Sequence, residues 1–257
     1  MRKSVNYDII APVYDRRYKE NDYSGVERAL LSFIGEDRSA QILEVGCGTG
    51  HWLTLLDRRG YRVAGLDASR SMVDQAKIKI PHAVLMHGHA EALPLKTASF
   101  DRIFCINAFH HFSDKTAFMT EARRVLRRGG SLMSISLDPH MDCNRWWVYD
   151  YFPQVIALDK GRYLPVYTIR ERMMDGGFTG CHTLEAQHIV RCIPAREAFD
   201  CGHLAKTATS QLALLTDDDY IQGIKQIQRD IETAEARNEV LTLHADLRLY
   251  ATMGWVV

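Results

Sequence analysis

The amino-acid sequence predicts an α/β fold: a doubly wound, mostly parallel seven-stranded sheet with helices on both faces. Between residues 40 and 137, apolar segments of strand length alternate with segments whose apolar residues recur at helical spacing. This alternation is typical of a parallel sheet that is covered by helices on both sides. A glycine-rich stretch over residues 46–50 follows the first apolar segment, as expected where a strand turns sharply into a helix.

The seven expected strands are short apolar runs, or runs in which apolar and polar residues alternate. They cover residues 41–45, 61–67, 83–86, 101–107, 131–137, 179–190 and 245–255. Pro139 follows the fifth of them and ends it, because proline cannot donate a hydrogen bond to a neighbouring strand.

Four helices are expected between these strands, over residues 52–57, from 70 to about 80, 115–127 and 168–177. Ser69 precedes the second helix and has the side chain of an N-cap. Gly129 and Gly130 follow the third helix, where glycine provides a C-cap.

Two segments interrupt the regular core after the fifth and sixth strands. Residues 139–166 are rich in tryptophan, tyrosine and arginine, and residues 194–240 are mostly helical in pattern. The clearest helix begins after Thr216, an N-cap followed by three aspartates that complement the helix dipole. One apolar face of this helix carries Ile221, Ile224, Ile227 and Ile231. Packing of this face on the main domain is favoured over a dimer interface.

Composition and charge narrow the classes of function. Lysine plus arginine equals aspartate plus glutamate at 32 each, whereas proteins that neutralise many phosphates carry a basic surplus. The arginines between 123 and 128 fall at a predicted helix end, where they complement the dipole. Nucleic acid is therefore a disfavoured partner.

The sequence also indicates a cytoplasmic protein. Charged N-terminal residues precede no apolar stretch, so no signal peptide is expected. No segment approaches the roughly 18 apolar residues that span a bilayer, so no membrane partner is expected. The six cysteines show neither a CxxC pair nor a spacing of metal ligands, and we expect reduced thiols and no metal.

The glycine-rich stretch over residues 46–50 and the acid that ends the next strand predict a binding site for a nucleoside. Gly46, Gly48 and Gly50 allow a tight turn and a close approach of the main chain to a ligand. Asp67 ends the next strand about 20 residues later, where a carboxylate accepts both hydroxyls of a ribose. A dinucleotide-binding turn has a third glycine or alanine at the position of His51, and a P-loop needs Lys-Ser/Thr. Adenosine without a pyrophosphate fits these departures.

These residues resemble motifs of the class I S-adenosylmethionine-dependent methyltransferases, which have a Rossmann-like fold. The type 11 family is the nearest group. The segments that carry the resemblance occur in the family order. They are residues 44–50 (EVGCGTG), 65–69 (GLDAS) with Met72, 90–95 (AEALPL) with 99–101 (SFD), 107–112, and 126–130 (LRRGG). The likeness covers residues 7–137 well and the remainder thinly.

The resemblance implies a cofactor, S-adenosyl-L-methionine, and a site for it. The side chains or backbone expected to bind it are Tyr14, Glu44, Gly46, Cys47, Gly48, Gly50, Asp67, Ala68, Met72, His89, Ala90, Glu91 and Asn107. Residues 1–36 resemble N-terminal lid helices, and residues 37–138 resemble the cofactor-binding core of one domain that spans 1–257. Many relatives have aspartate where this chain has His89, which either accepts the same adenine hydrogen bond or is a solvated loop residue.

The implied reaction is methyl transfer to a small molecule. Because the cofactor is intrinsically reactive, the protein mainly has to orient the acceptor and sometimes remove a proton. His110 and His111 are the candidate catalytic bases, although such a pair is often structural, and His140 is a weaker candidate. Arg145, Trp146, Tyr149 and Arg162 are the expected substrate-binding residues. The same aromatic segment could instead pack as a hydrophobic cover.

Three alternatives stay open at this point. The chain could bind the cofactor without catalysis, because motif and fold do not fix activity. It could methylate a metalloid such as arsenite through Cys143, Cys181, Cys192 or Cys201, or act as a dehydrogenase, which His51 disfavours. The leading hypothesis is a small-molecule methyltransferase that is a monomer or a homodimer.

Overall fold

The computed structural model of the protein describes residues 5–257. Its centre is one eight-stranded sheet with the order β3-β2-β1-β4-β5-β8-β6, in which β7 also pairs with β8. The strands are β1 (Gln41–Val45), β2 (Arg62–Asp67), β3 (Val84–His87), β4 (Phe100–Ile106), β5 (Leu126–Leu137), β6 (Arg145–Trp146), β7 (Thr179–Pro194) and β8 (Thr242–Trp255). The first five are parallel, whereas β8 is antiparallel to β5, β6 and β7. The α/β class and the mostly parallel sheet are confirmed.

The expected seven strands are all present, and one strand was missed. The additional strand β6 has two residues, which pair with Ala245 and Asp246 of β8. So short a strand has no periodicity of its own, because its pairing is decided by the neighbouring β8.

The register of the parallel strands determines where functional residues meet. Val45 of β1 lies beside Leu66 of β2, and Glu44 lies beside Phe104 of β4. The carboxyl ends of these three strands therefore share one edge of the sheet. The residues that follow them, from Gly46, Asp67 and Asn107, lie at that edge, where ligands bind in open α/β sheets.

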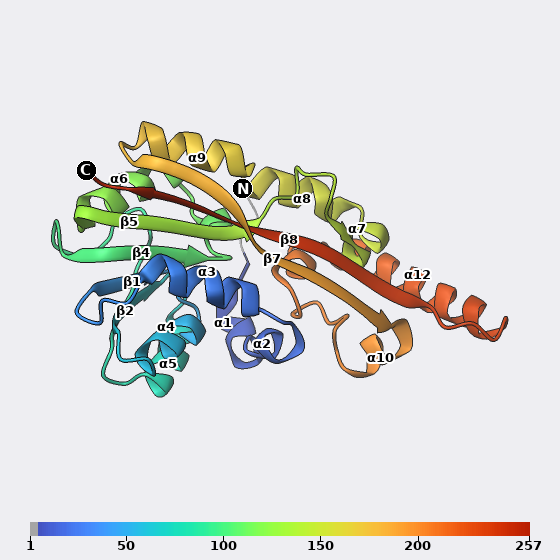
Figure 1. The fold of residues 1–257 in the computed structure, drawn as a ribbon. Coiled ribbons are helices and arrows are strands. Elements are labelled where there is room, and N and C mark those ends of the chain that lie inside the picture. The colour runs from blue at the N-terminus through green and yellow to red at the C-terminus, as the bar shows by residue number, and fades with distance from the viewer. Residues whose placement is uncertain (1–4) are drawn as a thin grey trace.

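Helices cover both faces of the sheet (Figure 1). On one face lie α3 (Ser24–Ile34), α4 (His51–Asp57) and α5 (Arg70–Lys79), and on the other lie α6 (Lys115–Val125) and α9 (Val166–Asp175). Separate apolar clusters fill the two interfaces, with Leu30 and Trp52 in one and Phe118 and Ile169 in the other. As predicted, Ser69 caps α5 by accepting a hydrogen bond from the Met72 amide. None of the helices over residues 5–257 is both long and apolar enough to cross a bilayer.

The expected end of the 115–127 helix was wrong. The helix α6 ends at Val125, and β5 begins directly at Leu126, so Gly129 and Gly130 lie in a strand rather than in a C-cap. Gly129 has a φ of +79° and its amide donates to the carbonyl of Val256, at 2.7 Å. Pairing with the C-terminal end of the chain thus overrides the local signal of the two glycines.

The two insertions form a third apolar cluster at the far end of the sheet, where β7 and β8 extend as a long ribbon (Figure 1). The first contains α7 (Trp147–Tyr151) and α8 (Gln154–Arg162), and the second contains α10 (Ala195–Asp200), α11 (Ser210–Ala213) and α12 (Asp217–Glu235). Thr216 caps α12 as predicted. Ile227 and Ile231 of its apolar face are buried in this cluster, whereas Ile221 is 46% exposed.

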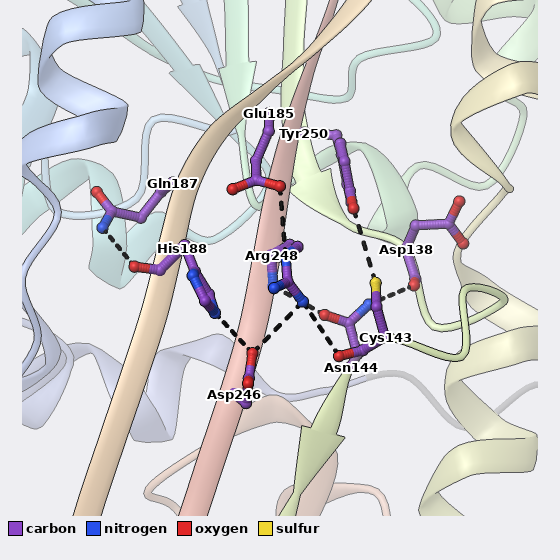
Figure 2. A network of polar contacts seen from close by, with 9 residues as sticks. All are labelled: Asp138, Cys143, Asn144, Glu185, Gln187, His188, Asp246, Arg248 and Tyr250. Atoms are coloured by element: carbon purple, nitrogen blue, oxygen red, sulfur yellow. Dashed lines mark hydrogen bonds and ion pairs between the residues drawn. The ribbon is translucent and has the colours of Figure 1, made fainter.

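A polar network fastens the start of the first insertion to the sheet (Figure 2). The amide of Arg248 on β8 donates to Asn144 Oδ1 at 2.8 Å, and Asn144 Nδ2 donates to the carbonyl of Asp138 at 2.8 Å. The carboxylate of Asp138 is buried and accepts hydrogen bonds from the amides of His140 and Val166, both at 2.9 Å. These hydrogen bonds hold the loop after β5 against β8 and against the start of α9.

Candidate active site

Positive φ angles and close packing require glycine in the turn between β1 and α4. Gly46 has a φ of +77°, and a Cβ atom there would lie 2.4 Å from the Cβ of Ala108. Gly50 has a φ of +75° and lies against Ala76 on α5. A Cβ on Gly48 would meet only the ring of Tyr14, at 3.6 Å. The turn thus presents its backbone to a ligand with no side chain between them. Cys47 is buried with its sulfur against Gly65, so its backbone is the part that is available.

Asp67 joins this turn to the end of β2. Its Oδ2 accepts a hydrogen bond from the Gly48 amide at 2.7 Å, and its Oδ1 accepts one from the Ser69 amide at 2.9 Å. Burial raises the pKa of this carboxyl group, while the hydrogen bonds from Ser69 and Gly48 act in the opposite direction. Each carboxylate oxygen can accept a second hydrogen bond. The pair of oxygens therefore fits two neighbouring hydroxyl groups of a ribose.

Glu44 adds an orphaned polar atom two residues before the turn. The side chain is 1% exposed, and within residues 5–257 its Oε2 has no hydrogen-bond partner. Burial, followed by the charge of Asp67, raises its pKa well above the ordinary value. Buried polar atoms are rarely left unpaired. A ligand that brings a hydrogen-bond donor, such as an ammonium group, fits this position.

The residues expected near an adenine lie in different environments. Met72 and Ala90 are buried, whereas Ala68 and His89 are exposed. Glu91 is engaged elsewhere, because its Oε1 accepts hydrogen bonds from the amide and hydroxyl of Ser113, at 2.6 and 2.8 Å. The carboxylate of Glu91 thus holds the loop before α6, and a role for it or for His89 toward a ligand stays a prediction.

The N-terminal helices lie over the glycine turn. They are α1 (Tyr7–Ile10), a 3₁₀ turn at Ala11–Val13, and α2 (Arg16–Glu20). Asp8 accepts a hydrogen bond from the Ser69 hydroxyl at 2.6 Å, and Asp15 bonds to both Thr49 and Lys79. These contacts connect the helices to the turn and to α5, so they can shield a bound ligand from water. Of the expected lid segment, residues 1–4 lie outside the described chain.

His111 is engaged by a tyrosine of these helices. The hydroxyl of Tyr7 lies 2.6 Å from His111 Nε2. Burial, with the nearby cations Arg162 and Arg17, lowers the pKa of His111 to about 3, and burial raises the pKa of Tyr7. His111 is therefore neutral and Tyr7 keeps its proton. The hydroxyl donates and Nε2 accepts, so this nitrogen is not free to act as a base.

His110 is the histidine of the pair that faces a cavity. Its ring is buried and stacks on Tyr163, with 3.9 Å between the ring centres. In the described part of the chain its Nδ1 has no partner. Burial is the largest cause that lowers its pKa well below the ordinary value, so the ring is neutral. His140, the weaker candidate for a catalytic base, is engaged elsewhere, since its Nε2 lies 3.1 Å from the carbonyl oxygen of Tyr163.

The cavity has a volume of about 260 Å³. Tyr14 lines it and lies next to the glycine turn, since its ring would be 3.6 Å from a Cβ atom on Gly48. Asn107 at the end of β4 lines the cavity too. Asn107 has a φ of +52°, and its amide donates to the Ile135 carbonyl at 2.8 Å. The apolar part of the wall consists mainly of Ile10, Val13, Leu137, Trp146, Trp147, Ile189, Ile193, Leu243, Leu247 and Leu249.

Of the four expected substrate-binding residues, Trp146 lines this cavity. Arg145 is exposed on β6. Tyr149 and Arg162 both bind the buried carboxylate of Asp159, at 3.0 and 2.5 Å. The structure does not place Arg145, Tyr149 or Arg162 in the cavity lining. Asp159 on α8 accepts hydrogen bonds from both Tyr149 and Arg162. These contacts could not be predicted from composition.

Other lining residues were missed from the sequence, notably Arg17, Tyr163, Arg191 and His203. One signal could have identified Arg191. Ile189, Arg191 and Ile193 alternate along β7, so they share one face of the strand, and all three line the cavity. A single cation on an otherwise apolar strand face indicates a polar ligand or partner.

Comparisons with known proteins find similar sequences among the methyltransferases. Residues 43–134 match the methyltransferase domain family. A demethylmenaquinone methyltransferase of Thermotoga maritima is 32% identical over 114 residues, which are 44% of this chain and 50% of that protein. A malonyl-[acyl-carrier protein] O-methyltransferase of Erwinia billingiae is 27% identical over 68% of this chain and 76% of its own length. The chain thus spans half of the length of the first relative.

Among solved structures, a SAM-dependent methyltransferase of Thermotoga maritima superimposes with a TM-score of 0.62. The superposition covers 98% of each chain at 16% sequence identity. At that identity the likeness establishes the fold alone, and the site rests on the residues described above.

Proposed function

We propose that the chain is a class I S-adenosylmethionine-dependent methyltransferase that transfers the methyl group of this cofactor to a small molecule in the adjoining cavity. The observation that carries the proposal is the position of Tyr14, whose ring would lie 3.6 Å from a Cβ atom on Gly48 of the turn and which also lines the cavity. A cofactor held by the turn and an acceptor held in the cavity would therefore be neighbours.

Several residues fit the cofactor. Asp67 would accept the ribose hydroxyls, the backbone from Gly46 to Gly50 would contact the nucleoside and methionine parts, and Glu44 would meet the ammonium group. When bound, the cofactor supplies a sulfonium-linked methyl group that a nucleophile can attack.

The protein itself would contribute orientation and shielding. The N-terminal helices, held by the bonds of Asp8 and Asp15, keep water away from the turn. His110 lines the cavity, and its ring would accept a hydrogen bond from the acceptor molecule. Because the ring is neutral at pH 7, it can align a hydroxyl or amine by a hydrogen bond. Its strongly lowered pKa makes it a weak base, so we assign it to positioning rather than to complete proton removal.

We favour a small acceptor over a macromolecule because several elements of the fold line the cavity. Its walls come from the N-terminal helices, from β7 and β8, and from both insertions. We therefore propose that the insertions at 139–166 and 194–240 form the acceptor side of one domain. For a metalloid methyltransferase we find no supporting arrangement, since no group of three or more histidine, cysteine or acidic side chains over residues 5–257 could hold a metal ion.

Two measurements test this function. Isothermal titration calorimetry with S-adenosylhomocysteine should show binding to the purified protein. Incubation with S-adenosylmethionine labelled in the methyl group, together with a bacterial metabolite extract, should then transfer label to a small molecule. Binding without any transfer would favour a non-catalytic binding protein, and label on protein or RNA alone would contradict the small acceptor.

A further inference from the structure

The charged residues in the cavity lining are unbalanced. The described lining contains three arginines, Arg16, Arg17 and Arg191, and one acidic residue, Glu20. His203 Nδ1 lies 3.2 Å from Glu20 Oε2, so this acid already has a partner. In the part of the chain that the structure describes, none of the three arginines forms an ion pair with an acidic side chain. The cavity therefore carries a net positive charge.

Arg191 is held in place by neutral groups. Its Nη1 donates to Asn21 Oδ1 at 3.4 Å, and its Nη2 lies 3.3 Å from His203 Nε2. A guanidinium group can only donate, so Nε2 of His203 accepts and the proton of a neutral His203 ring is on Nδ1, facing Glu20. Arg191 is thus positioned without being neutralised. Three of its five N–H groups have no partner in these contacts.

Arg17 lies in the same lining and is surrounded by aromatic rings. Its guanidinium lies 4.6 Å from the ring centre of Tyr14, a contact that stabilises a cation but does not cancel its charge. Asn21 links the two arginines, because its Nδ2 donates to the Arg17 carbonyl at 3.0 Å while its Oδ1 accepts from Arg191. Both arginines therefore line the same cavity, and Asn21 contacts the guanidinium of Arg191 and the main chain of Arg17.

The wall around Arg191 is apolar because successive residues of β7 and β8 point to opposite faces of the sheet. Ile189 and Ile193 flank Arg191 on β7, and Leu243, Leu247 and Leu249 on β8 line the same cavity. Trp146 and Trp147 add aromatic surface. A ligand that fills this space needs an apolar body and a group that pairs with arginine.

We propose that the acceptor is an amphipathic organic anion, with a carboxylate or phosphate bound by Arg191 and Arg17 and an apolar body on β7 and β8. This inference rests on the proposed function and names the substrate class of the same site. Arginine binds both groups through paired N–H donors, so the geometry assigns the anionic class and leaves the choice between the two groups to experiment. The same charge repels a cationic acceptor.

The test uses matched pairs of probes on the full-length protein saturated with S-adenosylhomocysteine. Calorimetry compares 4-phenylbutyrate with 4-phenylbutyramide, and decanoate with decanamide, and phenyl phosphate serves as the phosphate probe. We expect at least one acid to bind about tenfold or more tightly than its amide, the scale of a charge-assisted hydrogen bond. The tighter of the carboxylate and phosphate probes identifies the preferred group.

Variants assign the effect to the arginine. Arg191→Gln should reduce the preference for acid over amide, because Arg17 alone remains to pair with the anion, and Arg191→Lys, which keeps the charge, should reduce it less. Arg196→Gln is the matched control, because Arg196 is paired with Glu235 on the surface. Equal binding of acid and amide, binding of neither, or an unchanged preference in Arg191→Gln would overturn the inference. Loss of S-adenosylhomocysteine binding by the wild-type protein would instead overturn the proposed function.

Discussion

Replacement of Asp67 by asparagine gives the sharpest test of the cofactor site. In the folded protein the carboxylate accepts hydrogen bonds from the amides of Gly48 and Ser69. The proposed ligand adds two ribose hydroxyls as donors to the same oxygens. Asparagine keeps one carbonyl oxygen but replaces the other by an NH₂ group that cannot accept. At least one charge-assisted hydrogen bond to the ligand is therefore lost, and the NH₂ group opposes another donor.

The expected loss in affinity for S-adenosylhomocysteine is about 1–3 kcal/mol, which is about a fivefold to 150-fold rise in Kd. Calorimetry on purified variants measures it, and a urea unfolding curve shows that the variant is folded. Asp74→Asn is the matched control, because Asp74 is exposed on α5 and contacts only Arg70 among the ion pairs described, at 3.6 Å. A folded Asp67→Asn protein with wild-type affinity would refute the assignment of Asp67.

Two further predictions concern the glycine turn and the buried histidine. In urea unfolding, Gly46→Ala should lose about 1–3 kcal/mol more stability than Gly60→Ala. Both glycines have positive φ angles, but only a Cβ atom at position 46 would meet Ala108. Equal losses of stability in the two variants would show that the packing argument is wrong. The pKa of His111 is about 3 in the folded protein, which lies below the pKa of about 6.5 of a histidine in the unfolded chain. The stability that this histidine contributes as a neutral ring is present above pH 6.5 and declines as the pH falls toward 3. Between pH 7.5 and 5.0 the wild type should therefore lose about 2 kcal/mol relative to His111→Gln, and a stability difference independent of pH would contradict it.

The sequence predicted the features that depend on local chemistry. The glycine turn, the N-caps Ser69 and Thr216, and the acid at the end of β2 were all identified, because each is determined by residues a few positions apart. Most of the strands were found for the same reason, since burial on both faces leaves a continuous apolar run.

Features decided by distant contacts were missed. The end of α6 at Val125 depends on the pairing of β5 with β4 and β8, and β6 exists only because β8 lies beside it. The cavity, too, is formed by residues that are distant in the sequence. Arg17 and Arg191 come from segments about 170 residues apart in the chain, and Asn21 brings them together. Composition predicted that the aromatic segment binds the substrate. It could not show that Tyr149 and Arg162 form hydrogen bonds with Asp159 instead.

The most direct test of the central claim is a crystal structure of the protein with S-adenosylhomocysteine. We expect the ribose within hydrogen-bond distance of Asp67, the ligand backbone over Gly46–Gly50, and the sulfur directed at the cavity beside Asn107 and His110. A ligand bound elsewhere, or a crevice between the turn and Tyr14 that stays closed to the ligand at saturating concentration, would contradict the account.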